Sequence, residues 1–227
     1  MVEMQSAKTD GGRGSSGRLP GGRMLGGALA LAACLALPGC ISLGAKPPEQ
    51  LIRLTPDDSA PAGTQVSGQV ADAIVVLDPD FDRSLDTPRV PVKIDASSLS
   101  YLKDAFWTER PARQMRTLLA ETLRARTGKL VVVGGDFETT GRTLIGGRLL
   151  DMGYDVPTRS VIVRFDATRT ERGGPITTRR FEAAVPNVKP DVADVAPALN
   201  RAANDVAKQV ADWVKGEATA PSAQYAQ

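Results

Sequence analysis

Three stretches of the sequence have residue types and spacings that could support chemistry, and the first is a glycine-containing loop. Residues 135–143 read G-D-F-E-T-T-G-R-T after an apolar stretch, which is the outline of a phosphate-binding loop. Five residues instead of four separate Gly135 from Gly141, and Arg142 stands where that motif has lysine. Residues 144–147 read L-I-G-G and do not predict a helix whose N-terminus would hold phosphate. We therefore interpret the segment as a hairpin loop.

The second stretch contains two acidic clusters that could supply oxygen ligands for calcium. Asp78, Asp80 and Asp82 form one cluster, and Asp57 and Asp58 form the other. Neither has the glycine and the distant glutamate of a helix-loop-helix calcium site, and Asp is a common turn residue. Turns are the simpler interpretation, so we predict no metal and no cofactor.

The third stretch has hydroxyl and amino groups that could form a hydrolase site. The sequence has no histidine, so a serine nucleophile would need a lysine or a carboxylate as its base. Ser97, Ser98 and Lys103 are near one another, but the motif G-x-S-x-G does not occur after residue 39. Carboxylate pairs for glycoside hydrolysis stay open, because their separation depends on the fold. We predict that the chain is not an enzyme and assign no catalytic residue.

Tyr101, Phe106 and Trp107 form the densest aromatic cluster of the sequence. One interpretation places Trp107 in the core, just before the first predicted helix. The other makes the cluster a contact for a partner protein or for lipid, because aromatic side chains are enriched at interface hot spots. We take the three residues as candidate partner contacts and leave both interpretations open.

The net charge of +2 comes from the N-terminus. Of 28 basic and 26 acidic residues, residues 1–39 hold four basic and two acidic ones, which leaves 24 of each in the remainder. A neutral body lacks the basic face that nucleic acids require, so we predict no nucleic-acid partner.

Residues 1–39 have the pattern of a secretion signal. Arg13, Arg18 and Arg23 precede residues 24–37, fourteen residues without a charged or strongly polar side chain. This length matches the apolar segment of a signal peptide, whereas a membrane-spanning helix needs about 20 apolar residues. We therefore predict that residues 1–39 are removed on secretion.

The signal ends in Gly39-Cys40, with Leu37 three positions before the cysteine. This arrangement resembles the lipobox of bacterial lipoproteins, which implies cleavage between Gly39 and Cys40, diacylation of the Cys40 sulfur and usually acylation of the new amino group. The alternative is ordinary cleavage that leaves a free thiol, a liability in an oxidising compartment. Ile41 and Ser42 stand where an aspartate usually retains such proteins in the inner membrane. We therefore expect a lipid anchor in the periplasmic leaflet of the outer membrane.

The mature chain divides into three parts. Residues 40–49 form a lipidated tether rich in Pro and Gly, and residues 216–227 form a small polar tail that we predict to be disordered. Residues 50–215 between them form one domain.

Two amphipathic helices are predicted in this domain. The first has Thr108 as its N-cap and Pro111 in its first turn, and it stops at Gly128. The second runs from its N-cap Asp194 to Val214. Each carries one apolar stripe at helical spacing. The stripes are Met115, Leu118, Leu119, Thr122 and Leu123 in the first helix, and Val195, Leu199, Ala202, Ala203, Val206, Val210, Trp213 and Val214 in the second.

Shorter stretches predict strands. Residues 160–168 and 180–185 alternate apolar and polar side chains, which indicates half-buried antiparallel strands. Other candidates are residues 51–54, 74–77, 90–94, 130–133 and 150–154. One mostly antiparallel sheet with both helices packed on one face would bury every apolar stripe, so we predict a single α/β domain of the α+β type.

Four features occur in a distinctive order along the chain. They are Cys40, the early strand Q-L-I-R-L, the segment Tyr101–Trp107 leading through T-E-R-P into the first helix, and R-F-E-A-A-V-P followed by the helix that ends A-D-W-V. In this order they resemble the ABC-type transport auxiliary lipoprotein family, which accompanies MCE-type lipid transport systems of Gram-negative bacteria. The junction after Trp107 is shifted by one residue from the W-A-E-P-L of usual members.

The resemblance implies a non-catalytic periplasmic component of a transport system for lipids or other hydrophobic compounds. Its implied partners are an MCE-domain protein, an ABC permease and ATPase complex, and the membrane through the anchor on Cys40. A homo-oligomer stays open. The alternative is an envelope structural or assembly lipoprotein that docks other periplasmic proteins, since a fold alone does not separate the two functions.

Overall fold

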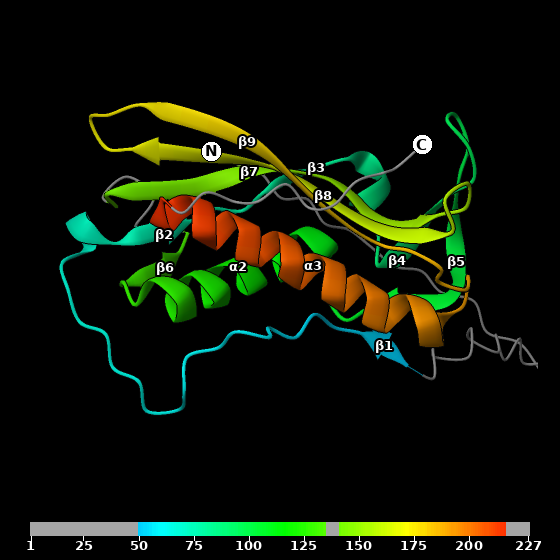
Figure 1. Ribbon diagram of the computed structural model, residues 1–227, viewed down its shortest axis with the longest axis horizontal. Coiled ribbons are helices and arrows are strands. Elements are labelled where there is room, and N and C mark those ends of the chain that lie inside the picture. Colours follow the sequence, from blue (N-terminus) through cyan, green and yellow to red (C-terminus); the bar gives the residue numbers. More distant parts are fainter. Residues whose placement is uncertain (1–49, 135–140, 217–227) are drawn as a thin grey trace, which may run out of the picture. The chain divides into compact units, whose positions relative to one another are not determined.

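Two long helices lie on one face of a nine-stranded sheet (Figure 1). The computed structural model describes residues 50–134 and 141–216, which belong to one unit, residues 47–227. The predicted signal, the tether and residues 217–227 of the predicted tail lie outside the described residues. None of the helices in the described ranges is long and apolar enough to cross a membrane.

Short strands come first along the chain and long strands later. The strands are β1 (Leu51–Ile52), β2 (Ile74–Val76), β3 (Asp80–Phe81), β4 (Arg89–Lys93), β5 (Leu99–Trp107), β6 (Val131–Val133), β7 (Thr143–Asp155), β8 (Ser160–Glu171) and β9 (Ile176–Val185). The helices are η1 (Val70–Asp72), η2 (Arg83–Leu85), α2 (Pro111–Thr127) and α3 (Val192–Lys215), where η marks a single 3-10 turn.

The long strand β7 organises the sheet. Along one edge it pairs antiparallel with β8, and β8 pairs antiparallel with β9. Along its other edge it pairs parallel with β2, β3 and β4 in succession. From β4 the sheet continues through β5 to β1, and from β2 it continues to β6. The β4–β5–β1 branch therefore lies at one end of the domain and the β2–β6 branch at the other (Figure 1).

The sheet is mixed, which corrects the prediction of a mostly antiparallel one. Five of the eight strand pairings among the described residues are parallel. Alternation of apolar and polar residues records which face of a strand is buried, and it carries no information about the direction of a neighbouring strand. The prediction was right for β8 and β9, which follow each other directly. It was wrong where long connections bring short strands together.

The helix α2 begins later than predicted. Its N-cap is Arg110 and not Thr108, while Pro111 occupies the first turn and Gly128 ends the helix with a φ of 63°. The Thr108 amide instead donates to the Ile52 carbonyl at 2.9 Å, so Thr108 still belongs to the contact between β5 and β1. All five residues of the predicted apolar stripe are buried.

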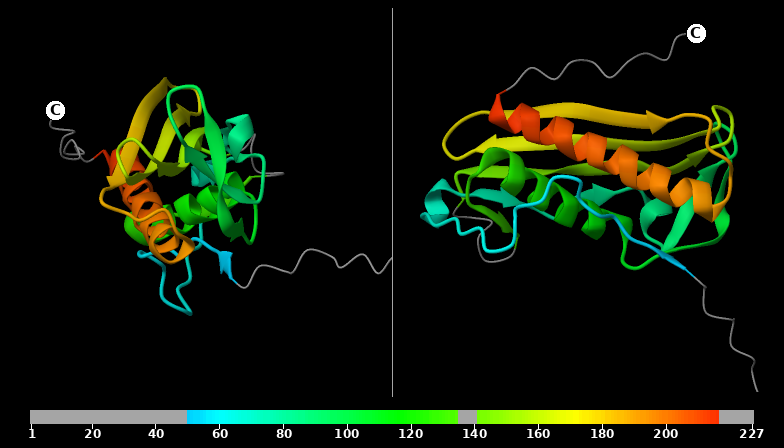
Figure 2. Two further views of the ribbon diagram at one scale, coloured as in Figure 1. Left: turned by 90° about the vertical axis from the view of Figure 1, so that its right-hand side faces the viewer. Right: turned by 60° about the horizontal axis from the view of Figure 1, so that its bottom comes forward.

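The helix α3 packs across β8 and β9 and against α2 (Figure 2). Its N-cap is Asp191 and not Asp194, because the Asp191 carboxylate accepts a hydrogen bond from the Asp194 amide at 2.9 Å. The predicted stripe is buried except for Trp213, whose half-buried ring lies 5.6 Å from that of Phe181. Alanine and valine dominate the buried side, which allows the helix to approach the sheet closely.

The segment after β1 lies against both helices and is held by side-chain amides. The Leu54 amide donates to the Gln114 side chain at 2.8 Å. Asn204, which is completely buried, accepts from the Asp57 amide at 2.8 Å and donates to the Thr55 carbonyl at 2.9 Å. These hydrogen bonds satisfy backbone groups that no neighbouring strand pairs with, and they hold residues 54–57 against the two helices.

Candidate functional site

The three predicted contact residues all belong to β5, but they face two ways. Trp107 is 3% exposed and is part of the hydrophobic core, as one of the two interpretations placed it. Tyr101 and Phe106 are half-buried on the face of the strand that points away from that core. Asp104, with a φ of 56°, interrupts the alternation of β5 between them. This irregularity explains why two residues five positions apart share a face.

Arg89 of β4 connects the two outward rings. Its guanidinium carbon lies 5.2 Å from the centroid of the Tyr101 ring and 6.0 Å from that of Phe106, within cation–π range. Within the described ranges, no carboxylate pairs with Arg89, and its Nε is buried without a hydrogen-bond acceptor. Sequence reasoning missed Arg89, because its pairing with Phe106 joins two strands and leaves no local signal along the chain.

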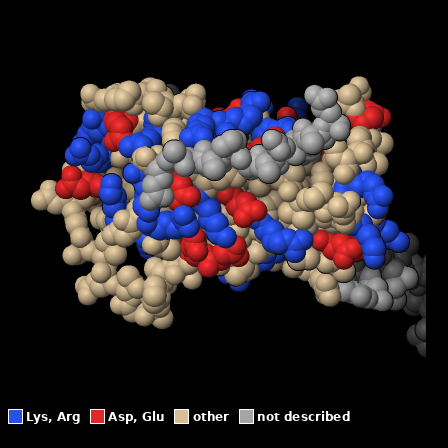
Figure 3. All heavy atoms as spheres, viewed as in Figure 1, with Lys and Arg blue, Asp and Glu red and all other residues tan. Residues whose placement is uncertain are grey.

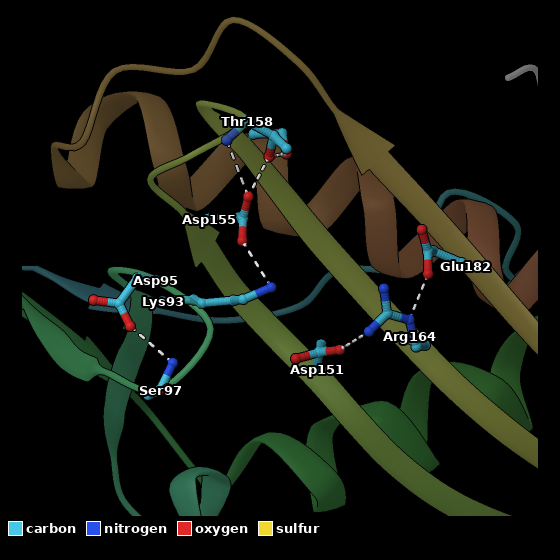
Figure 4. A network of polar contacts seen from close by, with 9 residues as sticks. Lys93, Asp95, Ser97, Asp151, Asp155, Thr158, Arg164 and Glu182 are labelled. Carbon is cyan, nitrogen blue, oxygen red and sulfur yellow. Dashed lines mark hydrogen bonds and ion pairs between the residues drawn. The ribbon is translucent and has the colours of Figure 1, made fainter. Parts of the chain in front are cut away.

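A polar network lies next to these strands, and its centre is Asp155 at the end of β7 (Figure 4). The Lys93 ammonium lies 3.3 Å from one oxygen of the buried Asp155 carboxylate. The other oxygen accepts from both the amide, at 3.0 Å, and the hydroxyl of Thr158. Burial alone would raise the pKa of Asp155, but the hydrogen bonds from Thr158 and the nearby Lys93 outweigh it and lower this pKa. Asp155 is therefore ionised at neutral pH.

Arg164 of β8 forms the second half of the network. Its guanidinium donates to Asp151 of β7 and to Glu182 of β9, so it ties three neighbouring strands together (Figure 4). Burial tends to lower the pKa of Arg164, but its two carboxylate partners raise it overall. Asp151 and Glu182 are thus hydrogen-bond acceptors of Arg164, as Asp155 is of Thr158.

The cavity at this network is small, and the wider hollows of the surface lie elsewhere. A cavity of about 50 Å³ lies between the two halves of the network, far below the roughly 300 Å³ or more of drug-sized ligand pockets. Two wider hollows, of about 590 and 600 Å³, contain Glu171 and Glu121, which are bonded to Arg169 and Arg124. Over the helical side in Figure 3, acidic and basic side chains are interspersed.

A family model described as "ABC-type transport auxiliary lipoprotein component" matches residues 54–211. The chain belongs to this family. The resemblance found in the sequence is thereby confirmed across most of the described domain. Membership makes the chain a lipoprotein of the cell envelope that assists an ABC-type transport system. No curated protein matches the sequence.

Solved structures share the architecture of this auxiliary lipoprotein at low sequence identity. Protein XCC0632 from Xanthomonas campestris is 20% identical, with a TM-score of 0.54, and the match covers 72% of this chain and 91% of that one. A crystal structure of an uncharacterized protein has a TM-score of 0.56 at 12% identity and covers 63% of this chain and 92% of its own. At these identities the two matches show a shared fold.

Four of the five acidic residues considered as calcium ligands have structural partners in this auxiliary lipoprotein. Asp78 pairs with Arg116 at 2.7 Å, and the Asp82 carboxylate caps η2 by accepting from the Ser84 amide at 3.0 Å. In the second cluster, Asp57 and Asp58 form ion pairs with Lys208 and Arg126. Among the described residues, no three His, Cys, Asp or Glu side chains gather in a way that could hold a metal ion.

Two other predicted features lie outside the described residues. They are Gly39 and Cys40, the predicted cleavage and lipidation site, and residues 135–140 of the glycine-containing loop. The lipid anchor on Cys40 stays a prediction from the sequence.

Asp155 gives the auxiliary lipoprotein a testable dependence on pH. Because the folded state lowers the pKa of Asp155, its contribution to stability is complete above about pH 4 and is lost as the pH falls through the folded-state pKa. Asp155→Asn is expected to lower the free energy of unfolding at pH 7 by about 1–3 kcal/mol and to flatten its decrease below pH 4. Urea denaturation between pH 3 and 7 measures both effects.

The matched control for this substitution is Asp95→Asn. Asp95 also has a lowered pKa, caused mainly by the Ser97 amide, but its side chain is fully exposed on the loop between β4 and β5. The control variant should therefore differ little from the parent at pH 7. An Asp155→Asn variant with the stability of the parent at every pH would contradict the role given to the buried carboxylate.

Proposed function

We propose that the chain is a non-catalytic, lipid-anchored component of an ABC transport system that works with an MCE-domain protein to move lipids or other hydrophobic compounds across the cell envelope. The observation that carries this proposal is the family match over residues 54–211. The lipobox-like Gly39-Cys40 supports it, because an acylated cysteine holds a domain at a membrane without a membrane-spanning helix.

The chemistry of the described domain supports a role without catalysis. The sequence has no histidine, and the carboxylates of the network around Asp155 and Arg164 are engaged in ion pairs and hydrogen bonds. A protein that only binds and positions other subunits needs no activated nucleophile and no perturbed acid. ATP hydrolysis would then belong to a separate cytoplasmic subunit.

The proposed location is the periplasmic leaflet of the outer membrane. The two residues after Cys40 are Ile41 and Ser42, neither of which is the aspartate of inner-membrane lipoproteins. In this position the domain would connect a transport complex of the inner membrane to the outer membrane.

The test is a mild detergent extraction of the tagged full-length protein from cell envelopes, followed by mass spectrometry of the captured proteins and lipids. We expect an MCE-domain protein together with an ABC permease, and neither from an untagged strain processed in parallel. Capture of other envelope proteins without any transporter subunit would contradict the proposal and favour the structural lipoprotein.

A further inference from the structure

Exposed apolar side chains gather at one end of the described domain. Six large apolar residues in the described chain are well exposed, and four of them lie on the β1–β5–β4 end or on the β7–β8 turn beside it. The four are Leu51, Ile94, Leu99 and Val156. The Val156 amide donates to the Lys93 carbonyl at 2.9 Å, which places the turn against the tip of the β4–β5 hairpin. Figure 2 (left) looks directly at this end.

A continuous stripe crosses this end along the outward face of β5. Leu51 is in parallel register with Phe106, and Arg89 lies over the rings of both Phe106 and Tyr101. Leu99, two residues from Tyr101, extends the stripe to the hairpin. Leu99 pairs with Lys93 and Phe106 pairs with Arg89, so the two lie about 13 Å apart along β4 at the usual rise of a strand. We call these five residues the β5 stripe. It combines two exposed leucines, two half-buried rings and one cation.

The cation of the stripe lacks an anion. The guanidinium of Arg89 faces two aromatic rings, and within the described ranges it has no carboxylate partner and a buried Nε without an acceptor. A guanidinium forms its strongest hydrogen bonds with phosphate or carboxylate oxygens. Tyrosine, phenylalanine and leucine beside it favour the zone where lipid headgroups meet acyl chains. A phospholipid surface supplies both the phosphate oxygens that a guanidinium binds and the boundary zone that the rings and leucines favour.

The N-terminal part of the chain also leads to this end. Gln50 directly precedes Leu51 of the stripe, and the ten residues from Cys40 to Glu49 span at most about 35 Å when extended. A lipid anchor on Cys40 would therefore hold the stripe at a high effective concentration next to the bilayer. The β8–β9 turn, at the opposite end of the domain in Figure 1, would face away from the membrane.

We propose that the β5 stripe is a membrane-contact surface, on which Arg89 binds a lipid phosphate while Leu51 and Leu99 enter the boundary between headgroups and acyl chains. This proposal rests on the lipid anchor of the proposed function. It gives the domain a defined orientation on the bilayer, with the helical layer and the β8–β9 turn left free for protein partners.

The test uses an environment-sensitive fluorophore on the lipidated mature chain. Leu99→Cys is labelled with a nitrobenzoxadiazole group. Ile176→Cys, at the most exposed large apolar residue of the described chain, is the matched control at the other end. Cys34 lies in the predicted signal and an acylated Cys40 has no free thiol, so the introduced cysteine reacts alone. The protein is reconstituted into vesicles of phosphatidylethanolamine and phosphatidylglycerol.

We expect blue-shifted and stronger emission from position 99 on vesicles, no change at position 176, and no change at either position with inorganic phosphate alone. In the Leu99→Cys background, Arg89→Gln is expected to weaken the contact about tenfold to a hundredfold, the effect of one hydrogen bond to a charged group.

Unchanged emission from position 99 in vesicles that hold the lipidated protein would overturn the proposal. A response to a protein of the transport complex without lipid would also overturn it, since the stripe would then be a protein-docking surface. Mass spectrometry of the reconstituted protein separates these results from failure of the anchor. An unmodified Cys40 would overturn the anchor, and with it the proposal.

Discussion

Trp107→Ala is expected to lower the free energy of unfolding by about 3–5 kcal/mol, the usual cost of truncating a large buried aromatic side chain. The ring is 3% exposed and belongs to the core beneath α2 and α3. Its loss removes buried apolar area and leaves a cavity that the surrounding side chains fill only in part. Since domains of this size have stabilities of roughly 5–15 kcal/mol, the substitution removes a large share of the total stability.

Urea denaturation followed by circular dichroism measures this effect. Circular dichroism is preferred to fluorescence because the substitution removes one of only two tryptophans. Phe106→Ala is the neighbouring control, as that half-buried ring should cost less. Trp107→Phe is a second control: within the described chain the indole nitrogen is buried without an acceptor, so phenylalanine also removes an unsatisfied group. Equal stabilities of the Trp107→Ala and Phe106→Ala variants would contradict a core role for Trp107.

The helices and their buried faces were predictable from the sequence because helical periodicity is a local property. Leu118 and Leu199 lie in stripes that repeat every three to four residues, and both are buried where the stripes placed them. The cap positions were less predictable. At the start of α3, Asp191 and Asp194 are both good capping residues three positions apart, and only the hydrogen bond between them decides which one is the cap.

The centre of the sheet was harder to predict, since β7 contains glycines that weaken a strand pattern. A Cβ on Gly153 would lie 2.4 Å from the Pro91 carbonyl oxygen of β4, and one on Gly147 would lie 2.0 Å from the Asp166 carbonyl oxygen of β8. Glycine occurs at these two positions because neighbouring backbones approach closely. Only residues 150–154, in the second half of β7, show the alternation of apolar and polar residues that predicts a strand.

The candidate contact surface was predictable in part. The aromatic residues of β5 stood out because of their density, but Arg89 acquires its importance only when β4 pairs with β5. Asn204 is a similar case. It follows Ala203 of the apolar stripe in α3, so a buried hydrogen bond could be expected, but its partners Thr55 and Asp57 are about 150 residues away in the sequence. Long-range pairing of this kind leaves no periodic signal.

Cys40→Ala is expected to abolish membrane association almost completely. An acyl chain contributes about 0.8 kcal/mol per buried CH₂, and two or more chains give stable anchoring. Without the cysteine sulfur no acyl chain can be attached, so the protein should appear in the soluble periplasmic fraction or remain as the longer precursor. The described domain contains no part of the signal, and it should fold as in the parent.

Fractionation of envelopes with intact-mass measurement checks this expectation, and Cys34→Ala is the matched control. Cys34 undergoes the same substitution six residues earlier, inside the segment that cleavage after Gly39 would remove. That variant should keep the mass and the membrane location of the parent. A Cys40→Ala protein of mature length that still sediments with the outer membrane would refute the anchor. In that case the β5 stripe alone would have to hold the domain on the membrane. A surface of two exposed leucines and one guanidinium is too small for stable membrane binding.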